Sequence, residues 1–138
     1  MTVDVGAIRT AMALALEAVG ELDVNAYVKA QPVPPGIQIL PPEIEHDATF
    51  GGVHGVTMWV FTVQGYVGIV DEIAPQQLLD DLIRPGGVKA ALEADRTLGG
   101  LVASLRVESN GPPRQVESSA GYPMLLVEWR VSMYVQGE

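Results

Sequence analysis

The chain has 138 residues, of which 48% are hydrophobic and 18% are charged, and it contains no cysteine. This length and composition favour one globular domain with its own core, and they exclude a disulfide framework, thiolate chemistry and sulfur-rich zinc sites. The chain has 17 acidic and 8 basic residues, a net charge of −9, and such a surplus disfavours tight binding to phosphate backbones.

The first predicted element is a helix that begins near Val5. One stripe of apolar residues, spaced three or four apart, runs along this helix. The stripe consists of Val5, Ile8, Met12, Leu16 and Val19. Either Thr2 or Asp4 is a suitable N-cap, and Gly20 is a suitable end. Alanines fill much of the remaining surface, so we expect this helix to pack closely against a sheet.

The next segment favours extended structure interrupted by prolines and glycines. Gln31–Gly36 contains three prolines and is expected to form a connection, because proline has no amide hydrogen for a strand ladder. A short strand, Ile37–Leu40, is predicted to follow it. Beyond two further prolines, Glu43–Ala48 is predicted to be a second short, exposed strand, and the glycines of residues 51–55 predict a flexible loop.

Residues 56–63 have the composition of a central strand that continues to about Val70. They are rich in β-branched and aromatic residues, and apolar side chains fall on both faces. The stretch is shorter than the roughly 20 residues that a membrane helix needs, so no membrane segment is predicted. If helices cover only one side of the sheet, the second face needs another cover, either a second layer or a neighbouring subunit.

Two helices and a strand are predicted after this. An apolar stripe begins at Ala74, and Pro85–Gly87 ends the helix that carries it. A shorter helix is expected from Val88 to about Asp95. A strand is expected over Leu101–Val107, and the segment Ser109–Pro113 is predicted to be a turn or loop.

The last strand has the clearest alternation of apolar and polar residues. Its apolar positions are Val127, Trp129, Val131, Met133 and Val135. We therefore predict a single α+β domain over residues 1–138, with a mostly antiparallel or mixed sheet packed against two to three helices.

No group of residues predicts an enzyme or a cofactor site. The group that most resembles a metal site contains Glu43, Glu45, His46, Asp47 and His54. Alternate strand residues point to opposite faces, so we interpret this group as a solvated strand leading into a glycine loop. No serine lies in a nucleophile-elbow pattern, and the paired glycines lack both the P-loop lysine and the dinucleotide spacing.

Three segments resemble a known protein family. They are Met1–Arg9 (MTVDVGAIR), Pro42–Gly51 (PEIEHDATFG) and Val88–Gly100 (VKAALEADRTLGG). Together they resemble the tail terminator proteins of siphophages, notably those that infect actinobacteria. The likeness covers most of the chain in the order of its predicted elements.

The resemblance implies a compact structural subunit without enzymatic activity or a cofactor. Its copies would form a hexameric ring on the last ring of tail tube protein, end tail polymerisation and dock to the head connector, where a head-closure protein is the partner. Such a subunit would be made in the host cytoplasm and would lie in the virion at the head–tail junction. DNA would pass through the ring without specific binding, and no membrane would be involved.

The family motif assigns no site residues, so the candidate partner interface is chosen from polar loops that a sheet is expected to hold. The candidates are Glu43, Glu45, His46, Asp47, Phe50, His54, Asn110 and Arg114.

Two other functions stay open on the sequence alone. Another neck or minor tail component, such as a head-closure or stopper protein, would have the same small size and acidity. A soluble small-ligand-binding α+β domain is the alternative from another class, with a pocket beside Trp59 and Trp129. For both tryptophans, packing in the core is the favoured interpretation.

Overall fold

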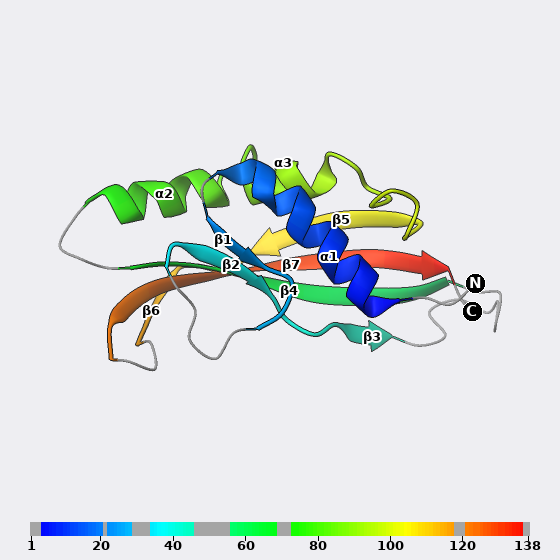
Figure 1. The fold of residues 1–138 in the computed structure, drawn as a ribbon, viewed down its shortest axis with the longest axis horizontal. Coiled ribbons are helices and arrows are strands. Elements are labelled where there is room, and N and C mark those ends of the chain that lie inside the picture. The colour runs from blue at the N-terminus through cyan, green and yellow to red at the C-terminus, as the bar shows by residue number, and fades with distance from the viewer. Residues whose placement is uncertain are drawn as a thin grey trace.

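A computed structural model of the chain describes residues 4–20, 22–28, 34–45, 56–68, 73–117 and 121–136. Its helices and strands, in chain order, are α1 (Val5–Leu16), the 3-10 turn η1 (Glu17–Val19), β1 (Asp23–Asn25), β2 (Gly36–Ile39), β3 (Glu43–Glu45), β4 (Val56–Gly68), α2 (Ile73–Ile83), α3 (Val88–Glu93), β5 (Ser104–Asn110), β6 (Arg114–Glu117) and β7 (Pro123–Gln136). One mixed sheet and the helices packed on it make an α+β domain, as predicted (Figure 1).

The two long strands β4 and β7 form the centre of the sheet. They pair antiparallel along their whole length, from Val56 opposite Gln136 to Gly68 opposite Met124. Both β2 and β3 pair with the outer side of β4, and both β5 and β6 pair with the outer side of β7. The short strand β1 extends the sheet beyond β2 in parallel. The outer strands are therefore short pieces aligned on two continuous central ones.

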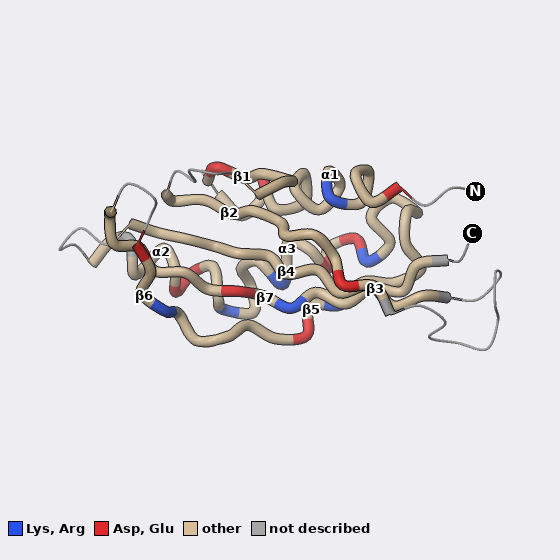
Figure 2. The backbone as a smooth tube through the Cα atoms, turned by 90° about the horizontal axis from the view of Figure 1, so that it is seen from below, with Lys and Arg blue, Asp and Glu red and all other residues tan. Residues whose placement is uncertain are grey.

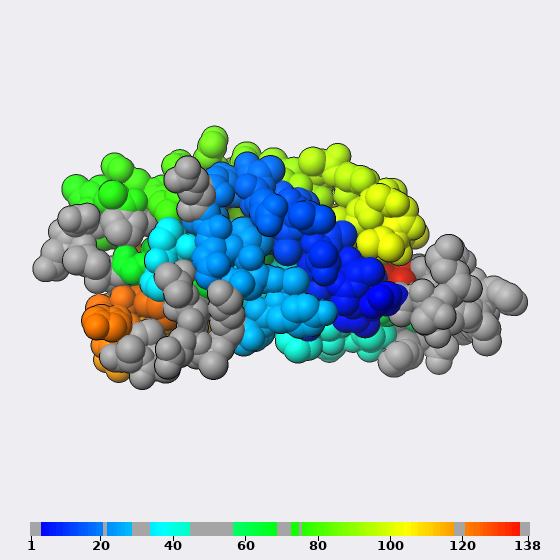
Figure 3. Space-filling view, viewed as in Figure 1, coloured from blue at the N-terminus to red at the C-terminus, as the bar shows by residue number. Residues whose placement is uncertain are grey.

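One face of the sheet carries the hydrophobic core. The odd-numbered residues of β4 and β7 point to this side, where α1, α2 and α3 pack on them. Trp59, Phe61 and Val63 of β4 meet Trp129 and Val131 of β7 in this cluster, and all five are buried. In Figure 3, α1 lies on the outside of the molecule across this layer. The alternation predicted for the last strand is confirmed by this burial.

The N-terminal helix forms where the apolar stripe predicts it. The Asp4 carboxylate accepts a hydrogen bond from the Ala7 amide at 3.2 Å and caps the helix, and the chain leaves η1 at Gly20. Arg9 lies on the buried side of α1 and joins this helix to the sheet. Its guanidinium donates to the Ala26 carbonyl at 2.7 Å and to the Ile39 carbonyl at 2.6 Å.

The strand predicted over Leu101–Val107 forms three residues later, and only residues 111–113 of the predicted turn lie outside the strands. The turn that follows α3 reaches further than expected, because the Asp95 carboxylate accepts from the amides of Thr97 and Gly99, and β5 begins only at Ser104. The strand then continues to Asn110 through a bulge between Val107 and Ser109. The long strand β7 provides backbone hydrogen-bonding groups for these residues. It also pairs with β6, a strand that the sequence did not predict.

Candidate interaction surface

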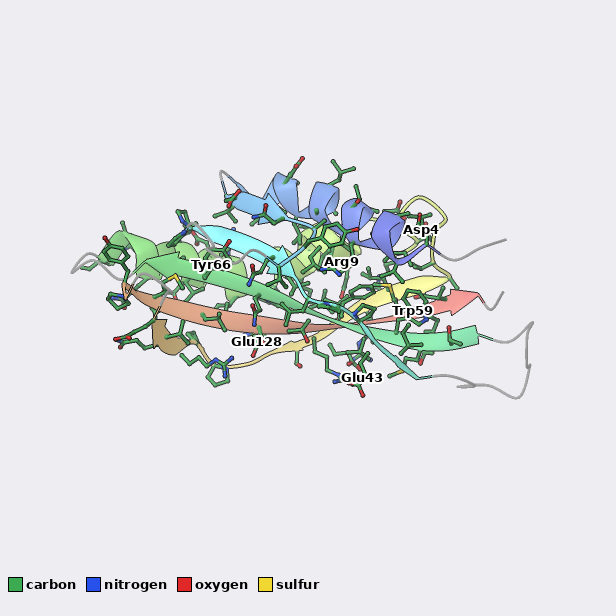
Figure 4. The ribbon with its side chains drawn as sticks, turned by 60° about the horizontal axis from the view of Figure 1, so that its bottom comes forward. Asp4, Arg9, Glu43, Trp59, Tyr66 and Glu128 are labelled. Atoms are coloured by element: carbon green, nitrogen blue, oxygen red, sulfur yellow. The ribbon has the colours of Figure 1, made fainter. Side chains whose placement is uncertain are left out.

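The second face of the sheet, which we call the open face, carries the even-numbered residues of β4 and β7. It consists of Met58, Val60, Thr62, Gln64 and Tyr66 on β4 and of Met124, Leu126, Glu128, Arg130, Ser132 and Tyr134 on β7. The helices among the described residues lie on the opposite side. Figure 4 turns this face toward the viewer, with Tyr66, Glu128 and Glu43 labelled. The face combines buried apolar residues with polar ones, so it differs from the core side in kind.

A chain of polar side chains crosses the open face. Gln38 of β2 donates to the Gln64 side-chain oxygen at 2.9 Å, and the Gln64 amide donates to Glu128 of β7 at 3.0 Å. The other oxygen of Glu128 accepts from Arg114 of β6 at 3.2 Å. These residues come from four strands, and the sheet register places Gln38, Gln64 and Glu128 directly side by side. Such a network restrains side chains on a face that none of the described helices covers.

A second ion pair lies further along the same face. Arg130 of β7 binds Glu108 of β5, with 2.6 Å between the guanidinium nitrogen and the carboxylate oxygen. Both side chains are partly exposed, so the pair adds little stability and serves mainly to orient the two groups. Among the described residues neither the exposed Arg106 nor the exposed Glu43 has a charged partner.

Tyr66 is the large buried residue of the open face. It is 1% exposed, and its hydroxyl has no hydrogen-bond partner within the described parts of the chain. Burial, and then the negative charge of Asp23, raise the pKa of Tyr66 to about 12, against an opposing effect of the Asn25 side chain. The ring lies against Gly36, where an added Cβ would come within 2.6 Å of the hydroxyl. Glycine is required there because the ring crosses the neighbouring strand so closely.

Glu93 joins the helix layer to the outer strand β5. Its side chain is 10% exposed, and it binds Lys89 of α3 and, at 3.1 Å, Arg96 of the turn that follows α3. It also accepts the amide of Val107 at 3.0 Å. Burial raises the pKa of this carboxyl, but the Lys89 hydrogen bond, the Val107 amide and the two cations outweigh it and hold the pKa below its ordinary value. At this edge of the sheet, the Glu93 carboxylate thus accepts the amide hydrogen that a carbonyl of a further strand would otherwise accept.

The structure places the predicted interface residues on opposite edges of the sheet. Glu43 is exposed on β3, at one edge, whereas Asn110 ends β5 and Arg114 begins β6 at the other edge. Asn110 donates to the Gly111 carbonyl, and Arg114 belongs to the network on Glu128. The remaining candidates, His46, Asp47, Phe50 and His54, lie outside the described residues, as does the side chain of Glu45.

Sequence reasoning missed the network of Gln38, Gln64 and Glu128. Gln64 and Glu128 stand at polar positions of alternating strands, which indicates an outward face. Their partners depend on the strand register, and no local pattern encodes it.

Both tryptophans pack in the core, as expected, and a hollow lies beside one of them. Trp59 is 6% exposed and Trp129 is 2% exposed. A hollow of about 290 Å³ opens between the end of α2 and β5, and Lys89, Arg106 and Asn110 line it together with Trp129. Little of the indole is accessible there.

The described residues include no cluster of three or more histidine, cysteine, aspartate or glutamate side chains that could hold a metal ion. Nor does any helix in the described ranges have the length and apolar character to span a membrane.

No protein-family model matches the chain, and no curated protein is significantly similar to it.

Proposed function

We propose that this chain is a structural virion protein of a long-tailed phage, a tail terminator whose copies form a ring at the head–tail junction. In this role it ends tail polymerisation and connects the tail tube to the head-closure protein. The observation that carries the proposal is the sheet with two unlike faces. One face is covered by helices, while a polar network crosses the other, a combination that suits contacts between proteins.

The segments on which the resemblance rests fall at distinct places in the fold. Described residues of the first segment form the beginning of α1, and those of the second include β3. The third covers α3 and the turn held by Asp95. These segments therefore contribute both to the core and to an exposed edge, as expected for a subunit that must fold by itself and also bind neighbours.

The nearest alternative is another neck protein, such as a head-closure or stopper protein. It would use the same kind of surface at a different position in the virion. A small-ligand-binding domain is supported only by the hollow beside Trp129, with Lys89 and Arg106 as its cationic groups. Glu108 lines the same hollow, which weakens its attraction for an anion.

The decisive experiment removes the protein from the phage that encodes it and examines the particles by electron microscopy. A terminator ends tail growth, so its loss should give tails of uncontrolled length and heads without tails. Wild-type virions labelled with an antibody to the chain should carry the label at the head–tail junction. Tails of normal length that fail to join heads would overturn the terminator function in favour of head closure. Normal virions without label would overturn both virion roles.

A further inference from the structure

The two buried tryptophans differ in what their indole nitrogens bind. The Nε1 of Trp59 donates to the Thr57 hydroxyl at 2.9 Å. The Nε1 of Trp129 has no acceptor within the described residues, although its side chain is 2% exposed and a buried indole N–H usually finds one. Among those residues the sealed side-chain polar atom without a partner is the Tyr66 hydroxyl, so solvent still reaches the Trp129 nitrogen. Trp129 lines the hollow between the end of α2 and β5, which makes this donor open to a ligand.

A bulge in β5 turns Asn110 to the same side of the sheet as Trp129. Before the bulge, even-numbered residues of β5 such as Arg106 pair with residues of the open face. The register shifts after Val107, and Asn110 then pairs with Trp129 on the core side. Bulges re-aim side chains in this way, and they are frequent beside binding sites. The Asn110 amide and the Trp129 indole consequently line one hollow.

The charges at the hollow leave one cation without a counter-ion. Lys89 is bound to Glu93 of its own helix. Glu108, the acid that lines the hollow, is bound to Arg130 at 2.6 Å, which offsets its charge. Arg106 also lines the hollow and has no ion pair with any residue that the structure describes. Figure 2 shows basic and acidic positions close together along β5 and β7. The surplus at the hollow is therefore a single positive charge.

The rest of the wall is apolar and limits the size of a ligand. Ile83 and Pro85 at the end of α2 and Val107 of β5 contribute to it. The volume of about 290 Å³ is near the lower end of the range for small-molecule sites. A ligand that fits must therefore be small and partly apolar, and its polar end must accept hydrogen bonds and carry one negative charge.

We propose that this hollow binds a small monocarboxylate with a compact apolar body. The carboxylate accepts the free N–H of Trp129 and pairs with the Arg106 guanidinium, and both are hydrogen bonds that an ionised acceptor strengthens. The apolar body lies against Ile83 and Pro85. A ligand with several negative charges is disfavoured, because Glu108 lies in the same wall and one cation alone is unpaired. This site is separate from any role in a virion.

The two indole N–H groups provide a direct test, because one is free and the other is bonded. The isotope-labelled full chain is titrated with benzoate as the probe, and both indole N–H resonances are followed by NMR, with a Trp59→Phe variant to assign them. We expect a saturable shift of the Trp129 resonance and no shift of the Trp59 resonance. Benzamide has nearly the same shape without the charge, and it should bind about tenfold more weakly or less.

A substitution at Arg106 tests the cation. Its side chain is exposed, so Arg106→Gln should fold normally. This variant should bind benzoate about tenfold more weakly than the wild type and should bind benzamide equally well. The matched control is Arg84→Gln, at an exposed arginine that lies outside the lining of the hollow, and its affinity for benzoate should be that of the wild type.

Four outcomes would overturn the proposal. Equal binding of benzoate and benzamide would contradict recognition of an anion, and unchanged benzoate binding by Arg106→Gln would contradict the part of Arg106. A shift of both indole resonances, or of neither, would contradict the site at Trp129. A response to inorganic phosphate but not to benzoate would contradict the carboxylate and the apolar body. These measurements use the purified chain, so they neither support nor weaken the role at the head–tail junction.

Discussion

The two faces of the sheet differ in what restrains their side chains. On the core side, close packing holds Phe61, Val63 and Val131 in place, because helices and neighbouring side chains fill the space around them. On the open face, Gln64 and Glu128 are held by hydrogen bonds of defined direction. The same two strands supply both sets, so the difference arises from what packs on each face and not from the backbone.

This difference predicts where the chain tolerates substitution. A core side chain that is shortened leaves a cavity, whereas an exposed side chain on the open face loses contacts mostly with solvent. A surface that can change without loss of folding can acquire binding specificity. The three predictions below separate stability, which we assign to the core side and to the contact between α3 and β5, from the weaker contribution of the open face.

The largest effect is expected from Trp129→Ala. The indole is 2% exposed and lies against the backbone of Gly65, where an added Cβ would meet the ring at 2.8 Å. Its removal should lower the free energy of unfolding by about 3–5 kcal/mol, measured by chemical denaturation. The matched change on the open face, Tyr134→Ala, removes a 47% exposed aromatic ring and should alter the free energy by less than about 1 kcal/mol. Equal losses would contradict the contrast between the faces.

An intermediate effect is expected from Glu93→Gln, and it should depend on pH. Because the folded-state pKa of Glu93 lies below its ordinary value of 4.5, its ionised form stabilises the fold above that value. This stabilisation is lost as the pH falls through the lower, folded-state pKa. The variant should therefore be about 1–2 kcal/mol less stable than wild type at neutral pH, and the difference should shrink in acid.

The control for this prediction is Glu117→Gln at an exposed position of β6. It should change stability little at either pH. A Glu93→Gln deficit that stays constant from neutral to strongly acidic pH would show that the charge of this carboxylate is not what holds β5 to α3.

The smallest effect is expected from Gln64→Leu on the open face. The change removes the bonds to Gln38 and Glu128 and leaves the 6% exposed Gln38 amide without this acceptor. We expect a loss of about 1 kcal/mol in the free energy of unfolding. The same substitution at the exposed Gln77 of α2 should be nearly neutral. A loss as large as that of Trp129→Ala would mean that the network holds the sheet together.

The sequence by itself determined the element types wherever local physics decides them. The stripe from Val5 to Val19 predicted α1, because helical spacing places those residues on one side, and Asp4 predicted its cap. The alternation from Val127 to Val135 likewise predicted β7 and its buried face. These patterns depend only on the geometry of a helix or strand and on the exclusion of apolar groups from water.

The tertiary structure determined which strands pair and in which register. Asn110 belongs to a strand and not to a turn because β7 provides a partner there, and Arg114 begins a strand for the same reason. The hydrogen bonds that join Gln38, Gln64 and Glu128 also depend on the register of three strands. Local preferences extend over a few residues, whereas a register is set by the packing of the whole sheet, so this network could be recognised only in the folded chain.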